Sequence, residues 1–268
     1  MKAKRIFVLV MAVVLCLGVF AGCSGKNDAK IADLDKIHKA GKIVVGITDY
    51  EPMNYYEANG SLTGFDTEYT RAVAEVLGVE AEFIEIDWDN KEIELNAGNI
   101  DAIWNGMTYT EERAKNMDFS KPYVLNEIVL VVRADDAEKY RSTADLASAK
   151  IVAEGGSSGE DCVAADENLK NASFTPVDGL IFSLMEVAAG TADAAAVDSV
   201  MARRLVGNGA YANLVIIPDV VLSDEVLAIA FRKGSDLSAE VDKITADLVK
   251  DGTIKALAEK YALTLVLE

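Results

Sequence analysis

The sequence is short of the residues on which metal sites, disulfides and nucleophilic catalysis usually depend. Its 268 residues include one histidine, His38, and three cysteines. Cys16 and Cys23 lie in an N-terminal segment with its own pattern, which leaves Cys162 alone. A lone thiol cannot close an internal disulfide, and one histidine with one thiol cannot build a zinc site. We therefore expect no metal, no cofactor and no catalytic residues.

Basic residues are scarce as well. Lys and Arg number 26 against 44 Asp and Glu, which gives a formal charge of −18. Nucleic-acid binding normally needs a basic stripe, so we expect no nucleic-acid partner. Only four prolines occur and 51% of the residues are hydrophobic, which excludes a disordered chain. The length suits one large domain or two modest ones.

The N-terminal segment has the pattern of an export signal. Basic MKAKR precedes an apolar run over residues 6–20, which is short for a bilayer span but suits a signal peptide. The sequence FAGC then ends at Cys23. We expect a lipoprotein signal over 1–22, lipidation of Cys23, a tether over 23–35, and an extracytoplasmic location at the outer face of the cell membrane. The alternative is a plain signal peptide cleaved near Ala21.

Apolar strands alternate with amphipathic helices along the rest of the chain. The first unit has expected strands at 43–48, 81–86 and 101–106, with helices over 64–78 and 91–98 between them. The pattern restarts with strands at 127–133, 150–154, 194–198 and 213–219, and a strand at 226–232 precedes a long helical region. Two successive α/β units predict an α/β fold with two lobes and parallel pairing.

Polar and aromatic side chains gather just after these strands. Ligands of open parallel sheets bind beyond the carboxyl ends of the strands. The candidates there are Asp49, Tyr50, Trp88, Asn105, Gly106, Thr108, Glu154, Ser157, Ser158 and Asp198, with Arg113 shortly after. A free α-amino acid needs such a set: a guanidinium and backbone N–H groups for its carboxylate, an acid for its ammonium, and aromatic faces for its side chain.

Several stretches, in this order, resemble a known family. GFDTEYTRAVAEVLG, DAIWNGMTYTEERAKNMDFSKPY, GGSSGED and TADAAAVDS are similar to signatures of the family 3 extracellular solute-binding proteins, the amino-acid receptors of ABC importers. The resemblance implies a two-lobed, periplasmic-binding-protein-like (type II) flytrap that docks on a membrane ABC permease. We expect a monomer, with lobe one at 36–123 plus 226–268, lobe two at 129–219, and crossover hinges at 124–128 and 220–225.

The resemblance also implies roles at the ends of the ligand. Arg113 clamps the α-carboxylate with help from Thr108 and Ser158, while Ser157 belongs to the same turn. Asp198 takes the α-ammonium, with the Gly106 carbonyl and the Thr108 hydroxyl as further acceptors.

The remaining candidates surround the ligand side chain. Tyr50 and Trp88 flank it, and Asp49, Asn105 and Glu154 tune the preference. Should both acids face the ligand, a cationic side chain (lysine, arginine or ornithine) is favoured. Glutamine and cystine are the alternatives.

Other interpretations compete with these roles. Thr110 can cap a helix that carries Arg113 on the surface, Asp198 can cap the helix after it, and the serines of GGSSG can simply start another. GGSSG also fits a hydrolase elbow, but no histidine follows it. Two rival functions stay open: a cyclohexadienyl-type dehydratase with Glu154 or Asp49 as general acid, and a lipid-anchored sensor that feeds no importer.

Overall fold

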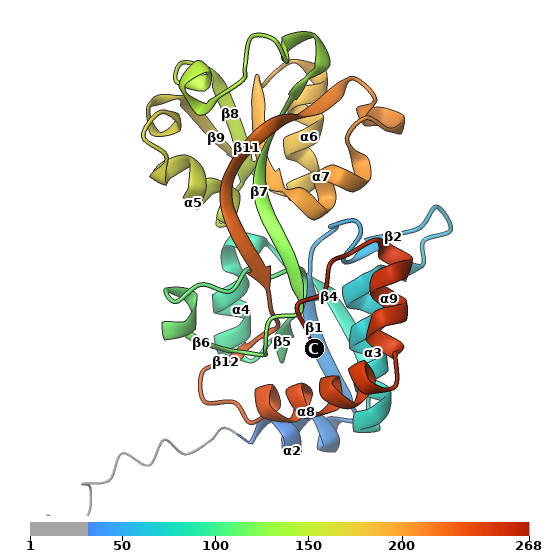
Figure 1. Cartoon of the computed structure of the whole chain (residues 1–268). Helices are drawn as coiled ribbons and strands as arrows, with labels where there is room; N and C mark the ends of the chain where they lie inside the picture. The colour runs from blue at the N-terminus through green and yellow to red at the C-terminus, as the bar shows by residue number, and fades with distance from the viewer. Residues whose placement is uncertain (1–31, 268) are drawn as a thin grey trace, which may run out of the picture. The chain divides into compact units, whose positions relative to one another are not determined.

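The computed structural model describes residues 32–267, which form two α/β lobes (Figure 1). The expected signal peptide and Cys23 lie outside the described residues. Within 32–267, no helix combines the length and the apolar character that a membrane crossing requires.

Lobe one, the lower lobe of Figure 1, is built on a mixed sheet with the strand order β4-β1-β5-β12-β6. β1 (Lys42–Ile47) pairs in parallel with β4 (Glu80–Glu85) and β5 (Ala102–Ile103). β12 (Ala230–Arg232) is antiparallel to both β5 and β6 (Met117–Phe119). The carboxyl ends of β1 and β5 therefore meet at one edge of the sheet.

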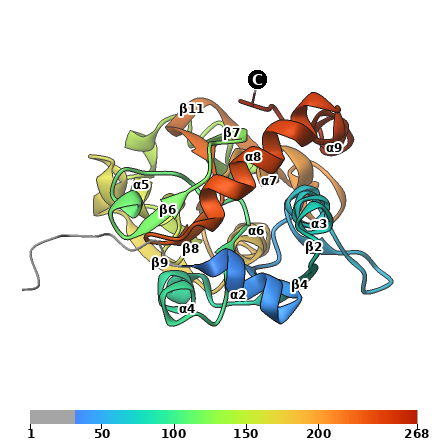
Figure 2. The ribbon, with the colours of Figure 1, turned by 90° about the horizontal axis from the view of Figure 1, so that it is seen from below.

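Helices cover both faces of this sheet, as the view from below shows (Figure 2). α4 lies on one face, and α3 and α8 lie on the other. The helices of the lobe are α2 (Asp33–Ala40), α3 (Phe65–Leu77), α4 (Lys91–Ala97), α8 (Leu237–Lys250) and α9 (Thr253–Tyr261), and a hairpin joins β2 (Tyr55–Tyr56) to β3 (Leu62–Thr63). Alternation along β1 explains the two layers, because Val44 packs toward α4 while Val45 joins the core beneath α3.

Lobe two, the upper lobe, has a second mixed sheet with the strand order β11-β7-β10-β8-β9. Its strands are β7 (Val124–Arg133), β8 (Lys150–Glu154), β9 (Ser173–Val177), β10 (Ala194–Asp198) and β11 (Leu214–Leu227). β10, β8 and β9 are parallel to one another, and β7 is antiparallel to both of its neighbours. The carboxyl ends of β8 and β10 therefore point the same way.

Three helices complete the upper lobe: α5 (Ser158–Ala165), α6 (Leu180–Ala189) and α7 (Ser199–Leu205). Val163 of α5 belongs to the buried cluster that contains Leu130, whereas Leu184 of α6 belongs to the cluster that contains Val131. Because neighbouring residues of β7 face opposite sides, α5 and α6 cover opposite faces of the sheet.

β7 and β11 lie side by side and run from one lobe to the other (Figure 1). Their pairing extends from Leu214↔Arg133 to Leu227↔Val124, with register shifts between Ile216 and Ser223. The expected hinge segments 124–128 and 220–225 thus fall inside paired strands, and the expected strand at 213–219 is the start of one long strand. The polar run at 223–225 interrupts the apolar pattern, but a two-stranded ribbon with one solvated face tolerates polar residues. The lobe boundaries themselves stay a prediction.

Two expected helices also differ. The segment after Thr110 forms only a 3-10 turn at Arg113–Lys115. The long C-terminal helical region is split at Gly252, whose φ of 91° lies in the left-handed region that favours glycine. His38 is exposed on α2.

Candidate functional site

A cavity of about 310 Å³ lies between residues of the two lobes. Its lining consists of Thr48, Tyr50, Trp88, Asn105, Gly106, Thr108, Arg113, Glu154, Ser157, Ser158, Leu180 and Asp198. Every expected site residue is present except Asp49, whose side chain is exposed. Thr48 and Leu180 were not expected.

Strand ends position most of this lining. Tyr50 follows β1, Asn105 follows β5, and Glu154 and Asp198 are the last residues of β8 and β10. Since these strands are parallel within each sheet, their carboxyl ends converge on one edge per lobe.

Arg113 enters the cavity from lobe one, and only 10% of its side chain is exposed. Its Nη1 donates to the Thr108 carbonyl (3.1 Å) and to the Ser158 hydroxyl (3.2 Å), and its Nη2 donates to the Gly156 carbonyl (3.4 Å). The carboxylate of Asp161 lies 3.7 Å away but is 76% exposed. The guanidinium is therefore held in place largely by neutral oxygens, and its charge is only weakly compensated.

The backbone of the 3-10 turn is capped as the competing interpretation predicts. The Arg113 N–H donates to the Thr110 hydroxyl at 3.1 Å. The cap does not turn the side chain to solvent, because the guanidinium points inward to Ser158. The local and the functional interpretations of this stretch are thus compatible.

Gly106 is required by the close approach of Tyr50. Its φ is 57°, and a Cβ at this position would lie 2.5 Å from Cε1 of the Tyr50 ring. Its N–H donates to Asp66 (2.7 Å), which also accepts from the Tyr123 hydroxyl (2.9 Å). Burial raises the pKa of Asp66 to about 7, against the effect of those two donors.

Asp198 enters the cavity from lobe two and is 8% exposed. It stands at the start of α7 but makes no side-chain capping bond there. Instead it accepts from Nδ2 of Asn126 at 2.6 Å. Burial, and then the negative charge of Glu225, raise the pKa of Asp198 to about 7. The capping interpretation therefore does not account for this acid.

Glu154 and Lys91 form a second polar group in the site. Glu154 lines the cavity and accepts from the Leu180 N–H at 3.2 Å, and burial followed by the charge of Asp198 raises its pKa to about 8. Lys91 donates to the carbonyls of Trp88 (3.1 Å) and Gly156 (2.8 Å). Burial and then the charge of Arg113 lower the pKa of Lys91 to about 8.

The side chains of two expected site residues, Asn105 and Ser157, make hydrogen bonds to neighbouring parts of the protein. Asn105 exchanges hydrogen bonds with the backbone and hydroxyl of Thr48 at 2.7–3.1 Å, which ties the ends of β1 and β5 together. Ser157 caps α5 by accepting from the Glu160 N–H at 3.3 Å.

The sequence analysis missed Asn126 and Glu225. Both were placed in the expected hinges, and both prove to be polar side chains paired across the β7–β11 ribbon. Glu225 accepts from the Thr108 hydroxyl at 2.8 Å, directly beside the cavity lining. No local pattern in the sequence distinguishes these two residues, because their pairing depends on the register of β7 and β11.

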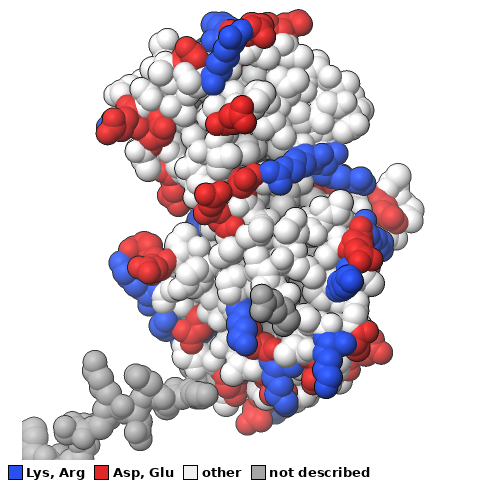
Figure 3. Space-filling view, in the orientation of Figure 1, with Lys and Arg blue, Asp and Glu red and all other residues white. Residues whose placement is uncertain are grey.

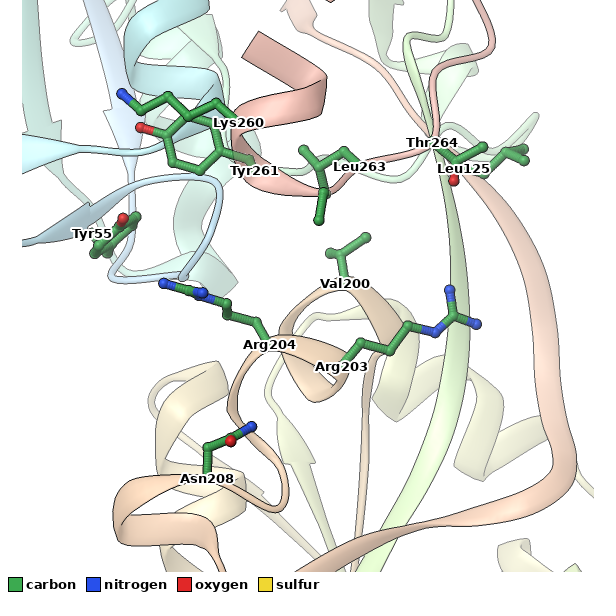
Figure 4. Close-up of a pocket in the computed structure, with 11 residues that line it drawn as sticks. Tyr55, Leu125, Val200, Arg203, Arg204, Asn208, Lys260, Tyr261, Leu263 and Thr264 are labelled. Atoms are coloured by element: carbon green, nitrogen blue, oxygen red, sulfur yellow. The ribbon is translucent and has the colours of Figure 1, made fainter. Parts of the chain in front are cut away.

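A larger hollow of about 1200 Å³ lies elsewhere between α7 and the C-terminal segment (Figure 4). Its basic residues, Arg203, Arg204 and Lys260, are each paired with an acid: Glu127, Glu51 and Glu68. Figure 3 likewise shows blue and red side chains next to one another where the halves meet. Compensated charges on an open rim make this hollow a poorer candidate than the buried cavity.

Comparison with known proteins agrees with this geometry. A family model for bacterial extracellular solute-binding proteins, family 3, matches residues 43–264. The chain belongs to this family. A curated relative of this solute-binding protein is the L-cystine-binding protein TcyJ of Escherichia coli (strain K12), 30% identical over 250 residues that cover 92% of each chain.

Solved structures of similar solute-binding proteins share the fold. The ancestral amino acid-binding protein AncCDT-1, a precursor of cyclohexadienyl dehydratase, is 35% identical with a TM-score of 0.78, covering 86% of this chain and 99% of that one. An amino acid ABC transporter substrate-binding protein from Streptococcus pneumoniae bound to L-arginine is 31% identical with a TM-score of 0.78, covering 88% and 100%. The expected family and the two-lobed α/β fold are confirmed.

Proposed function

We propose that this protein is a monomeric, lipid-anchored receptor that binds a free polar L-amino acid and delivers it to an ABC importer. The observation that carries the proposal is the pair of Arg113 and Asp198, a cation whose side chain is 10% exposed and a buried acid, which come from different lobes and line one cavity. An amino acid carries the two complementary charges.

Arg113 is proposed to hold the α-carboxylate. Its present partners are neutral oxygens, so a carboxylate that replaced one of them would gain a charge-assisted, forked contact. The Ser158 hydroxyl lies 3.2 Å from the guanidinium and is proposed to assist, together with Thr108, whose backbone carbonyl accepts from the guanidinium at 3.1 Å.

Asp198 is proposed to hold the α-ammonium, with the Gly106 carbonyl and the Thr108 hydroxyl as neutral acceptors. Because Arg113 and Asp198 belong to different lobes, a ligand that binds both favours the closed arrangement through contacts that exist only there. Docking of the closed form on the permease then follows from the family.

Tyr50, Trp88 and Glu154 are proposed to contact the ligand side chain, with Asn105 holding the turn behind them. Once it has lost its proton, Glu154 favours a positively charged group at the far end of the ligand. Arginine, which the Streptococcus pneumoniae relative binds, and cystine, named for TcyJ, both carry such a group. Only cystine adds a second carboxylate there, and Lys91, which donates to the carbonyls of Trp88 and Gly156 beside the cavity lining, is its proposed partner.

A thermal-shift screen with the twenty amino acids, ornithine, citrulline and cystine tests the proposal, since a ligand that binds the folded state raises Tm. Arg113→Ala should abolish the shift for every amino acid. Lys115→Ala removes an exposed cation from the same 3-10 turn and is the matched control, which should bind normally. Equal losses in both variants, or none in either, would contradict the carboxylate clamp.

Two further variants test which ligand side chain the site prefers. Glu154→Gln should weaken arginine and cystine binding about tenfold or more while leaving neutral amino acids unchanged. Lys91→Met should weaken cystine but not arginine. A parallel loss for all ligands in Glu154→Gln would show that this residue supports the pocket rather than specificity.

A dehydratase is the second candidate, because one observation favours it. Glu154 is a cavity carboxyl group with a pKa of about 8, so it is largely protonated at neutral pH and suited to act as a general acid. Incubation with prephenate or arogenate should yield aromatic product only if the protein is this kind of enzyme, and Glu154→Gln should then abolish the product.

The lipid anchor has its own test. Cys23→Ser should release the protein from the membrane fraction of cells, whereas Cys162→Ser, which changes the other cysteine outside the apolar signal run, should leave it there. Release of both variants, or of neither, would contradict anchoring through Cys23.

A further inference from the structure

The buried carboxyl group of Asp198 and the half-buried one of Glu225 meet beside the cavity through a single amide. Asn126 and Glu225 face each other across the β7–β11 pairing. The Nδ2 of Asn126 donates to Asp198 at 2.6 Å and to Glu225 at 3.3 Å. One donor thus joins the proposed ammonium acceptor to an acid that belongs to the ribbon between the lobes.

The surroundings fix the orientation of that amide. Oδ1 of Asn126 accepts from the Ser199 hydroxyl at 3.3 Å and from the Val200 N–H at 3.5 Å. A backbone N–H can only donate, so the amide oxygen points to α7 and the NH₂ group points to the two acids. The Thr108 hydroxyl, at 2.8 Å, is a further donor to Glu225.

Burial raises the pKa of both acids. The pKa of Asp198 is raised to about 7 by burial and then by Glu225. Burial also raises the pKa of Glu225, although hydrogen bonds from Thr108 and Ser158 oppose the change. Two close carboxylates in a buried site cannot both ionise without a large cost, so such a pair retains a proton.

The charged and titratable neighbours come from every element around the pair. Arg113 from the 3-10 turn favours ionisation of both acids, and Glu154 at the end of β8 opposes it. Tyr50 from the turn after β1 and Cys162 from α5 face the pair as neutral groups, because burial raises the pKa of the phenol well above 10 and that of the thiol to about 12.

We propose that Glu225 is a positioning residue for the ligand's ammonium and acts through Asp198. In the ligand-free protein the two carboxyl groups hold a proton between them, and they release it to solvent when the ammonium binds. Binding therefore strengthens as pH rises, approaching tenfold per pH unit, or about 1.4 kcal/mol, for one proton. This inference rests on the proposed function.

Calorimetric titration with L-arginine, or with L-cystine if arginine does not bind, tests the proton release. Titrations run from about pH 5.5 to about pH 7, where the α-carboxylate stays ionised and the α-ammonium stays protonated. Cacodylate and bis-Tris both buffer in this range and differ in ionisation enthalpy, so the difference in binding heat between the two buffers counts the protons released. We expect a release of at least about half a proton for the wild type.

Three variants assign the proton. Glu225→Gln keeps the shape but removes the like charge, so the release should fall by half or more and affinity should become nearly independent of pH. Asp224→Asn removes an exposed acid from the next position of β11 and should behave as the wild type. Glu154→Gln tests the other cavity acid, because any release that remains in this variant does not come from Glu154. Circular dichroism checks that each variant is folded. The wild-type titration tests the proton release even if a variant fails to fold.

The possible results distinguish a failure of the proton release from a failure of the proposed function. Binding without proton release in the wild type overturns this inference and leaves the proposed function standing. Release that persists in Glu225→Gln but disappears in Glu154→Gln assigns the proton to Glu154 and also overturns it. Failure of every amino acid to bind overturns the proposed function, and this inference with it.

Discussion

Two arginines of lobe one, Arg113 and Arg232, expose little of their side chains but have opposite surroundings. Arg232 is 8% exposed, and its Nη2 lies 2.6 Å from a carboxylate oxygen of Asp33 and 3.0 Å from one of Asp101. Both of those acids are themselves buried. Arg113 is 10% exposed, yet the one carboxylate found within 4.0 Å of it among residues 32–267 is the exposed Asp161.

The difference teaches how a structural cation can be told from a binding one. Arg232 ties α2 to the sheet, and its charge is fully paired inside the fold. Arg113 is held by hydroxyl and carbonyl oxygens that orient a guanidinium without cancelling its charge. Two arginines with similarly low exposure can therefore have different roles, one structural and one in binding, and the partners of each side chain indicate which role it has.

Replacing Arg232 should have the largest effect on stability. Arg232→Met leaves Asp33 and Asp101 buried without their partner, which typically costs about 3–5 kcal/mol in the free energy of unfolding. Urea denaturation measures this cost. Lys233→Met removes the next cation, which is 53% exposed in its pair with Asp118, and should cost less than about 1 kcal/mol. A similarly small cost for Arg232→Met and Lys233→Met would contradict a structural role for Arg232.

Replacing Arg113 should instead affect ligand binding. Arg113→Ala should reduce affinity for the best amino acid about 30-fold or more, equivalent to about 2 kcal/mol, because the ligand carboxylate loses its buried partner. The free energy of unfolding without ligand should change much less than in Arg232→Met. Calorimetric titration and urea denaturation of the same variant measure both quantities, and the reverse pattern would break the comparison.

The two regions should also respond to pH in opposite ways. Burial raises the pKa of Asp198 to about 7 from 3.8, so its contribution to stability is full below about pH 4 and is lost as pH rises through about 7. Asp198→Asn should flatten that loss by more than about 1 kcal/mol between about pH 5 and pH 8. Urea denaturation at these values, without ligand, measures it.

Asp101 beside Arg232 has the opposite sign. Burial alone would raise its pKa, but hydrogen bonds from Val44, Lys36 and Arg232 outweigh it and hold the pKa below 3.8. Its contribution is therefore present above about pH 4 and lost as pH falls further. Asp101→Asn should flatten the acid limb of the stability profile and leave the neutral limb unchanged. Equal slopes in both variants would remove the distinction.

The sequence predicted the strand-end part of the site because parallel strands bring their carboxyl ends together whatever the loops do. It could not decide between Asp49 and Tyr50, since adjacent residues of one turn face different directions and only packing selects the buried one. Asn126 and Glu225 were missed for another reason. Their partnership depends on the register of two strands far apart in sequence, which no local pattern encodes.

The smallest expected effect concerns Asp161, and it tests the comparison most directly. This carboxylate is 76% exposed and lies 3.7 Å from Arg113, so solvent screens the pair and Asp161→Ala should change unfolding and ligand binding by less than about 1 kcal/mol each. Thermal shift with and without the best amino acid measures both. A loss of binding close to that of Arg113→Ala would make Asp161 the working counter-ion. Arg113 would then be a paired cation like Arg232, and the distinction between the two arginines would fail.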